Sequence, residues 1–297
     1  MDAVLILRIV LIAWTLVFLV YMIKDCMAHK EDFDGKHMIA LAIIGAITNF
    51  LDTLGIGSFA TTQAGFKFTK SSPDAIMPGT LNVGDTVPVV LEAVLFFGAI
   101  ELDPILLVGF LAAAVIGAVI GAGIVVKWPV KIVRIALGAA LLILAIIMFC
   151  RQLGVGPFGA TGTITTLAKL GMVKFVIGLV VNFVLGALMT IGVGLYAPCM
   201  ALIGALGMNI GAAFPIMMGS CAFLMPSAGI KFVKEGKYDR KASIMLSIFG
   251  AIGVLIAYYI VKSLPLTILT YVVIVVMIFT SITFFYDASK SVADVKE

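Results

Sequence analysis

Thr53-Leu54-Gly55-Ile56-Gly57-Ser58-Phe59-Ala60 and Thr190-Ile191-Gly192-Val193-Gly194-Leu195-Tyr196-Ala197 share one pattern, a threonine followed by two glycines that alternate with aliphatic residues. The second stretch follows the first by 137 residues, and Pro215 follows Pro78 by the same interval. Asn49-Phe50 and Asn182-Phe183 are 133 residues apart, about one helical turn out of step. The chain is therefore predicted to contain two repeats of a glycine-interrupted apolar segment.

The composition is typical of an all-α polytopic membrane protein. Hydrophobic residues make up 62% of the chain, charged residues 12%, and the mean hydropathy is +1.21, whereas a soluble domain has roughly 25% charged residues. Runs such as 103–126 and 265–286 exceed the roughly 20 residues that cross a bilayer as a helix. Strand-like alternation is missing, which argues against an outer-membrane barrel. The net charge of +4 comes from short loops between apolar runs, so we expect no nucleic-acid partner.

The first apolar run, at residues 3–23, is interpreted as a retained transmembrane helix. It is too long for a signal-peptide core, Lys24 follows it, and no A-x-A cleavage site closes it. The further apolar segments are at 39–68, 76–99, 103–126, 130–149, 173–206, 208–230, 242–262 and 265–286.

The segments at 39–68 and 173–206 are too short for two full crossings and long for one, so each is predicted to be a re-entrant pair of half-helices. The positive-inside rule favours this reading. With both hairpins re-entrant, 15 basic residues lie on one side and four on the other, and Arg8 lies inside the first helix. The four are Arg151, Lys169, Lys174 and Lys262. If both segments were single crossings, this bias would weaken.

The predicted topology has an outside N-terminus, a cytoplasmic C-terminus, seven crossings and two hairpins. Each repeat contains one hairpin and three crossings, and because three is odd the repeats are inverted. The predicted parts are an N-terminal helix with its cytoplasmic loop (1–38), repeat one (39–150), a glycine-rich external linker (151–172), repeat two (173–286) and a cytoplasmic tail (287–297). The glycines of the linker are interpreted as a flexible connection and not as a phosphate-binding loop, because no GK[ST] follows them.

Two hairpins that enter from opposite faces would bring their glycine-rich tips together near the bilayer centre. Helix starts there expose unpaired N–H groups and partial positive charge, which attract anions, and the same arrangement marks transporter binding sites. Pairs of glycines in membrane helices often serve only for close packing; the repetition beside Asn, Thr and Pro favours a site. The predicted substrate-binding residues are Asn49, Thr53, Gly55, Gly57, Ser58, Asn82, Asn182, Thr190, Gly192, Gly194, Ser220 and Cys221.

Three carboxyl side chains, of Asp52, Asp85 and Glu92, lie within apolar segments. A charge there costs at least about 2.5–3.5 kcal/mol, so each is a candidate for proton coupling. Asp85 and Glu92 are seven residues apart and share one helical face. Two structural alternatives stay open: Asp52 could cap the second half-helix, and Glu92 could pair with a loop lysine or lie in a wet vestibule.

The four cysteines, Cys26, Cys150, Cys199 and Cys221, have no metal-type spacing. We expect no metal, no cofactor and no catalytic residues.

The chain resembles the TauE/SafE family of sulfite exporters, polytopic proteins whose two homologous halves each open on a glycine-rich motif. The resemblance covers about residues 39–286. Six residues of this chain match motif positions of the family: Thr53, Gly55, Gly57, Thr190, Gly192 and Gly194. The family often has GxGGG followed by proline. Here the first motif lacks that proline, and the second has Pro198. The resemblance implies transport of small sulfur-containing or organic anions, including sulfite, thiosulfate and sulfonates.

The sequence thus predicts an ion-coupled permease for a small anion in the plasma membrane, in contact with lipid, with a homodimer as one candidate assembly. An anion channel is the main alternative. An intramembrane aspartyl protease using Asp52 and Asp85 is disfavoured, because Asn82-Val83-Gly84-Asp85 lacks the first glycine of GxGD.

Overall fold

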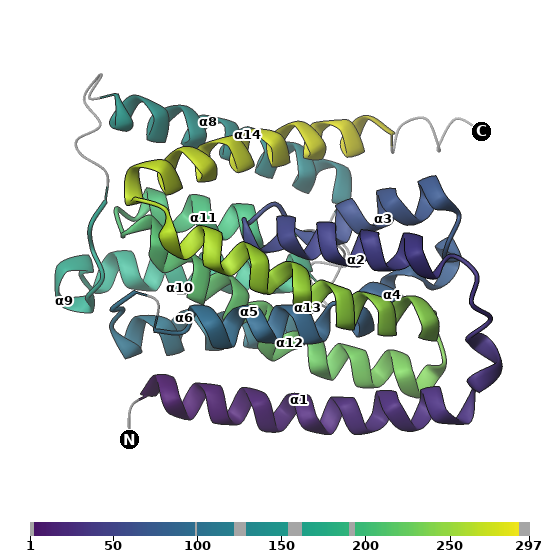
Figure 1. The fold of residues 1–297 in the computed structure, drawn as a ribbon. Coiled ribbons are helices and arrows are strands. Elements are labelled where there is room, and N and C mark those ends of the chain that lie inside the picture. Colours follow the sequence, from purple (N-terminus) through teal and green to yellow (C-terminus); the bar gives the residue numbers. More distant parts are fainter. Residues whose placement is uncertain (1–2, 99, 122–128, 154–161, 190–193, 291–297) are drawn as a thin grey trace. The chain divides into compact units, whose positions relative to one another are not determined.

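The computed structural model describes residues 3–98, 100–121, 129–153, 162–189 and 194–290 (Figure 1). Helices make up most of these ranges, and the only β-pairing within them is an isolated bridge between Ile164 and Met208. The α-helices are α1 (Ala3–Ala28), α2 (Met38–Thr53), α3 (Ser58–Thr69), α4 (Met77–Gly84), α5 (Thr86–Phe96), α6 (Pro104–Ile116), α8 (Val130–Gln152), α9 (Leu167–Leu170), α10 (Met172–Met189), α11 (Tyr196–Ala205), α12 (Ala213–Glu235), α13 (Arg240–Ser263) and α14 (Leu266–Lys290). Short 3₁₀ turns lie at Lys30–Asp32, Asp74–Ile76 and Ile210–Ala212, and a π-helical turn lies at Gly117–Gly121.

Seven helices in the described ranges are long and apolar enough to cross a membrane, which confirms an all-α, membrane-embedded chain. They are Ala3–Ala28, Met77–Phe96, Arg134–Gln152, Met172–Met189, Ile210–Glu235, Arg240–Ser263 and Thr267–Ser289. The number of candidate spans equals the number of predicted crossings, but one helix of the set differs. Met172–Met189 is a candidate span, although the sequence predicts it as part of the second hairpin. The predicted crossing at 103–126 contains, in its described part, only the shorter apolar helix Pro104–Ile120.

The chain divides into two compact units. The first unit consists of Met1–Thr53, Gly57–Ala99 and Met218–Lys262, and the second of Leu54–Ile56, Ile100–Met217 and Ser263–Glu297. Each unit therefore combines segments from both predicted repeats. The compact units cut across the repeat boundaries, which stay a prediction.

In the first unit, α1 contacts α5 and buries one stripe of its surface. The stripe is formed by Leu11, Thr15, Phe18, Met22 and Cys26, at the helical spacing of three and four residues. The rest of α1 carries large exposed apolar side chains, as expected for a helix in lipid.

The one charge inside the apolar part of this helix, on Arg8, is directed at the end of α5. Its guanidinium donates to the carbonyl oxygens of Val94, at 3.1 Å, and Phe97. A cation is favourable at a helix C-terminus, which explains why an arginine is tolerated at this position.

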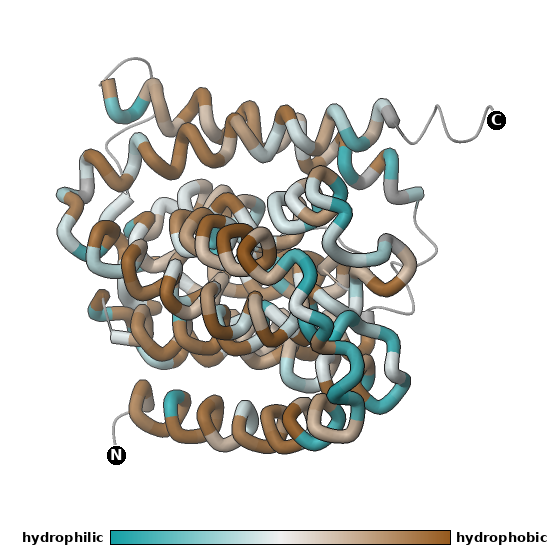
Figure 2. The backbone as a smooth tube through the Cα atoms, turned by 45° about the vertical axis from the view of Figure 1, so that its right-hand side comes forward, coloured by the Kyte–Doolittle hydropathy of each residue, from teal (hydrophilic) through white to brown (hydrophobic). Residues whose placement is uncertain are grey.

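Hydrophilic residues gather at the C-terminal end of α1 and in the loop that follows it, at residues 24–37 (Figure 2). This segment is tied to the start of α13 by three ion pairs. Arg240 Nε lies 2.6 Å from Asp25 Oδ2, Arg240 Nη1 lies 2.7 Å from Asp32 Oδ2, and Lys241 Nζ lies 2.6 Å from Asp34 Oδ1. The Tyr238 hydroxyl also donates to Asp25 Oδ2, at 2.7 Å. These contacts fix α1 within the first unit.

The segment at 39–68 forms two helices, α2 and α3, that pack against each other as predicted. The Thr62 hydroxyl donates to Thr48 Oγ1 at 2.8 Å, and the Cβ of a substituted Gly65 would meet Ile44, so the two helices run antiparallel. The outer face of α2 is closely covered by α13: a Cβ at Gly253 would overlap the carbonyl oxygen of Ala46. Small residues allow this approach.

In the second unit, α6 packs on α10 through glycines of both helices. A Cβ at Gly178 would meet the Phe110 ring, and one at Gly186 would overlap the carbonyl of Ala114. Helices α8 and α14 lie side by side (Figure 1), and Ser281 Oγ of α14 donates to Gly138 O of α8 at 2.7 Å.

The same type of turn follows α3 and α11, at the interval of 137 residues that separates the two glycine motifs. After α3, Ser71 N donates to Phe66 O at 3.2 Å; after α11, Met208 N donates to Ile203 O at 3.1 Å. Both donors and both acceptors are 137 residues apart, and a 3₁₀ turn follows each time. The sequence interval is thus matched by local structure.

Two predicted loops differ from the structure. Residues 162–171 of the predicted flexible linker are held by backbone hydrogen bonds: Asp103 N donates to Thr165 O, and Asn209 N to Ile164 O, both at 2.9 Å. Pairing of these backbone groups overrides the glycine-rich composition. The second loop is the one expected between the apolar segments 208–230 and 242–262. Helix α12 continues into this lysine-rich segment as far as Glu235, because lysine is a good helix former.

Candidate functional site

The break between α2 and α3 is built from two glycines in a conformation that other residues rarely adopt. Gly55 has φ +94° and Gly57 has φ +92°, so the backbone of the motif favours glycine at both positions. Within the second unit, Gly55 lies against α11, where an added Cβ would be 2.5 Å from Met200 Cε. The glycine motif therefore makes a sharp turn and also permits a close approach.

Asp52 caps the helix that begins after this turn. Its Oδ1 accepts a hydrogen bond from the backbone N–H of Ser58, the first residue of α3, at 2.7 Å. Both residues are buried, at 3% exposure. This confirms the capping alternative for Asp52. It also means that the Ser58 N–H, predicted as an anion donor, is occupied by a carboxyl oxygen of the protein itself.

Asp85 lies at the junction of α4 and α5 and contacts α2. Asn49 Nδ2 donates to Asp85 Oδ1 at 3.1 Å and to Gly45 O at 3.0 Å, and both Asn49 and Asp85 are fully buried. The carboxyl groups of Asp85 and Asp52 are close enough to interact electrostatically. Two carboxyls from separate helices therefore share one buried environment.

Glu92 contacts the same helix one turn further along. Thr53 Oγ1 lies 2.8 Å from Glu92 Oε1 and 2.9 Å from Asn49 O, so its one hydroxyl hydrogen is shared between these two acceptors. Because Asp85 and Glu92 both bind α2 residues four positions apart, the predicted shared face is confirmed. The wet-vestibule alternative for Glu92 is wrong, since its exposure is 0%.

Two oxygens of this network have no hydrogen-bond partner within the described ranges: Asp85 Oδ2 and Asn49 Oδ1. Leaving a buried polar atom unpaired costs about 1–3 kcal/mol. Such atoms in a native structure call for a functional or solvent partner. The network is thus able to accept a proton, a water molecule or a polar ligand group.

Sequence reasoning missed the residues that hold Asn49 in place. A Cβ at Gly250 of α13 would lie 2.7 Å from both Asn49 Nδ2 and Pro88 Cγ, so Gly250 makes room for the amide. The small residues along α13 are the signal that could have indicated a closely packed partner for α2.

The remaining predicted site residues do not join this network through a described contact. Asn82 Nδ2 donates to Pro78 O of its own helix at 2.8 Å, and Asn182 Nδ2 in the second unit donates to Phe110 O at 2.8 Å. Ser220 and Cys221 are buried in α12. Gly194 is exposed, with open space around it.

Thr190 and Gly192 lie outside the described residues. The predicted meeting of the two tips stays a prediction.

The two predicted repeats differ in acidity. Residues 137 positions after Asp85 and Glu92 are Ala222 and Gly229. The three carboxyl groups of the network therefore all come from the first predicted repeat. In the described ranges, the carboxyl network included, no group of three or more His, Cys, Asp or Glu side chains is arranged to hold a metal ion.

Comparison with known proteins gives no match: no family model, no curated protein and no solved structure is similar to this chain.

Proposed function

We propose that this protein is a secondary transporter that moves a small anion across the plasma membrane together with a proton. The observation that carries the proposal is the hydrogen bond between Asp52 Oδ1 and the backbone N–H of Ser58, at the buried start of α3. It supports the proposal because a helix start attracts anions, and the carboxylate of Asp52 is a negative charge that protonation would remove from such a helix start.

In this proposal, the carboxylate of Asp52 competes with the substrate anion for the N-terminus of α3. While its carboxylate accepts the Ser58 N–H, the partial positive charge of the helix start is neutralised and an incoming anion is repelled. Protonation removes that charge, and the helix start then attracts a substrate anion. Proton and anion therefore bind together, which is the thermodynamic requirement for co-transport.

The neighbouring carboxyl of Asp85 supports the same role. Two buried carboxylates that interact electrostatically are costly to keep charged together, so the pair is suited to hold one exchangeable proton. Asp85 Oδ2 has no hydrogen-bond partner within the described ranges and is available to carry it. Glu92, bonded to Thr53, holds α5 against α2 next to the pair.

The substrate class follows from the resemblance of the two glycine motifs to those of sulfite exporters, and comprises sulfite, thiosulfate and sulfonates. A half-helix N-terminus suits these oxyanions, because backbone N–H groups donate hydrogen bonds to oxygen. The first residue of α3, Ser58, adds a hydroxyl group at this helix start.

Uptake of labelled sulfite by proteoliposomes tests the proposal. We expect saturable uptake that an inward proton gradient accelerates and that unlabelled thiosulfate or a sulfonate reduces. No flux above that of protein-free liposomes, with all three anions, would contradict it. Counterflow distinguishes a carrier from an anion channel, because a carrier preloaded with unlabelled anion accumulates label transiently and a channel does not.

One observation favours a second candidate, an intramembrane aspartyl protease: Asp52 and Asp85 are buried and interact electrostatically. The hydrogen bonds oppose it, because a protease dyad uses its carboxyls to activate water, whereas here Asp52 binds the Ser58 N–H and Asp85 binds Asn49. Cleavage of a transmembrane peptide that is lost in both Asp52→Asn and Asp85→Asn would establish the protease.

A further inference from the structure

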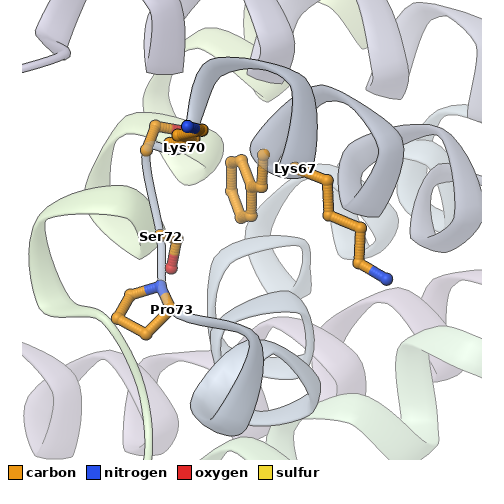
Figure 3. A pocket seen from close by; sticks show the side chains of 6 residues that line it. Lys67, Lys70, Ser72 and Pro73 are labelled. Atoms are coloured by element: carbon orange, nitrogen blue, oxygen red, sulfur yellow. The ribbon is translucent and has the colours of Figure 1, made fainter.

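A pocket lies at the end of the first hairpin, within the first unit and separate from the carboxyl network (Figure 3). Its volume is about 490 Å³, and it is lined by Phe66, Lys67, Lys70, Ser71, Ser72 and Pro73. In Figure 3, Lys70, Ser72 and Pro73 follow one another along the turn, and Lys67 extends from α3 on the other side. Two ammonium groups and two hydroxyls give the lining the character of an anion site.

One hydroxyl of the pocket lacks a partner. Ser72 is 9% exposed, and its Oγ has no hydrogen-bond partner in the described part of the chain. The neighbouring hydroxyl of Ser71, in contrast, accepts a hydrogen bond from Thr69 Oγ1 at 2.8 Å. A buried serine hydroxyl that lines a basic pocket and is not used by the fold is suited to donate to a ligand oxygen.

The backbone at Lys70 gives a second, independent argument. Lys70 has φ +51° and ψ +39°, a left-handed conformation that non-glycine residues adopt at an energetic cost. The equivalent turn 137 residues later has Gly207, with φ +77°, at the same position. At the later turn the left-handed position is thus occupied by glycine, which adopts this conformation without strain. Lysine in the strained position indicates that its side chain has a use.

The surroundings identify the source of the anion. Phe68, between the two lysines on the last turn of α3, is 90% exposed, whereas Phe66 is fully buried. A large exposed aromatic residue next to lysines at the end of an apolar hairpin is typical of the boundary between acyl chains and headgroups. From the pocket, the free hydroxyl, the strained lysine and this aromatic residue, we infer that the site binds the phosphate of an anionic phospholipid headgroup.

In the bound state, the ammonium group of Lys70 pairs with a phosphate oxygen and Ser72 Oγ donates a hydrogen bond. The charge of Lys67, which extends on the other side of the pocket (Figure 3), adds attraction for the anionic surface, and Phe68 lies among the acyl chains. Each lysine near a membrane surface contributes about a factor of five in affinity for anionic lipid. Loss of both lysines is therefore expected to weaken binding about 20-fold or more. This site does not depend on the transport proposal.

The test measures the melting temperature of the full-length chain in phosphatidylcholine nanodiscs, with and without phosphatidylglycerol. We expect phosphatidylglycerol to raise the melting temperature of the wild type, and Lys67→Gln/Lys70→Gln to abolish most of that rise. Lys30→Gln/Lys36→Gln, which removes the same charge from the loop after α1, is the matched control and retains it. Ser72→Ala is expected to weaken the affinity about threefold or more, as for one lost hydrogen bond, and so to give a smaller rise in melting temperature than the wild type.

Lys70→Gly separates a ligand role from a structural one. Relief of the left-handed conformation raises its melting temperature in neutral lipid, while the response to phosphatidylglycerol falls. A response equal to that of the wild type in Lys70→Gly and in the double variant would overturn the inference. Soluble glycerol phosphate is expected to compete only weakly. Protection by inorganic phosphate without any effect of phosphatidylglycerol would contradict the lipid assignment.

Discussion

The hydrogen bond between Thr53 and Glu92 gives a quantitative test of the buried network. Thr53 Oγ1 lies 2.8 Å from Glu92 Oε1, and both residues have 0% exposure. Thr53→Val keeps the shape of the side chain and removes the hydroxyl. A buried hydrogen bond contributes about 0.5–1.5 kcal/mol net, or about 1.5–3 kcal/mol when one partner is charged. We therefore expect a coupling energy of about 1–3 kcal/mol between Thr53→Val and Glu92→Leu.

The cycle is measured by equilibrium unfolding in mixed micelles, followed by circular dichroism, for the wild type, both single variants and the double variant. The coupling energy isolates the Thr53–Glu92 bond from the other contacts that each residue makes. Thr62→Val is the control, since Thr62 donates to Thr48 on the same hairpin at 2.8 Å; its coupling to Glu92→Leu should stay within about 0.5 kcal/mol. A Thr53–Glu92 coupling no larger than this control would refute the network.

Three further outcomes are expected. Gly253→Ala places a methyl group against the carbonyl of Ala46, so it should lower the free energy of unfolding by about 1–3 kcal/mol; unfolding like that of Ile252→Leu, on the exposed side of α13, would speak against the close packing. A hydrogen bond from Lys241 lowers the pKa of Asp34 below its ordinary value of 3.8, so stability present at neutral pH is lost as the pH falls below about 4, and Asp34→Asn should remove this acid-dependent loss in a series of melting curves. Burial, together with a hydrogen bond to Asp25, raises the pKa of Tyr238 above its ordinary value of 10.0, so stability is lost as the pH rises above about 10; Tyr238→Phe should be insensitive there, and an unchanged alkaline transition would show that another group controls it.

The fold class could be predicted from the sequence because its signals are local. Apolar runs of sufficient length, and the glycines at 55 and 57, are enough to predict helices and a break between them. The small residues of α13 indicate a closely packed neighbour, but they do not show that this neighbour is α2, which lies about 200 residues away in the sequence. For the same reason, the two compact units were not evident from the repeats.

The candidate site was predicted in part. The carboxyl positions stood out because charges are rare in apolar helices. The sequence could not show which oxygen meets which donor: the use of Asp52 as the cap of α3, and the pairing of Asp85 with Asn49, depend on the antiparallel geometry of the hairpin and on the side chain of a separate helix. The ordered turn at 162–171 was missed because tertiary backbone pairing is invisible in a glycine-rich composition.

The central claim, that a proton on the Asp52–Asp85 pair accompanies anion binding, is tested most directly by calorimetry. Binding of a transported sulfonate, which does not titrate near neutral pH, is measured in buffers of different ionisation enthalpy, so that the slope gives the number of protons taken up per anion. For the wild type and for Asp287→Asn, a control at the end of α14, we expect uptake of about one proton. For Asp52→Asn we expect binding without proton uptake. Anion binding by the wild type with no proton uptake, or unchanged uptake in Asp52→Asn, would contradict the account.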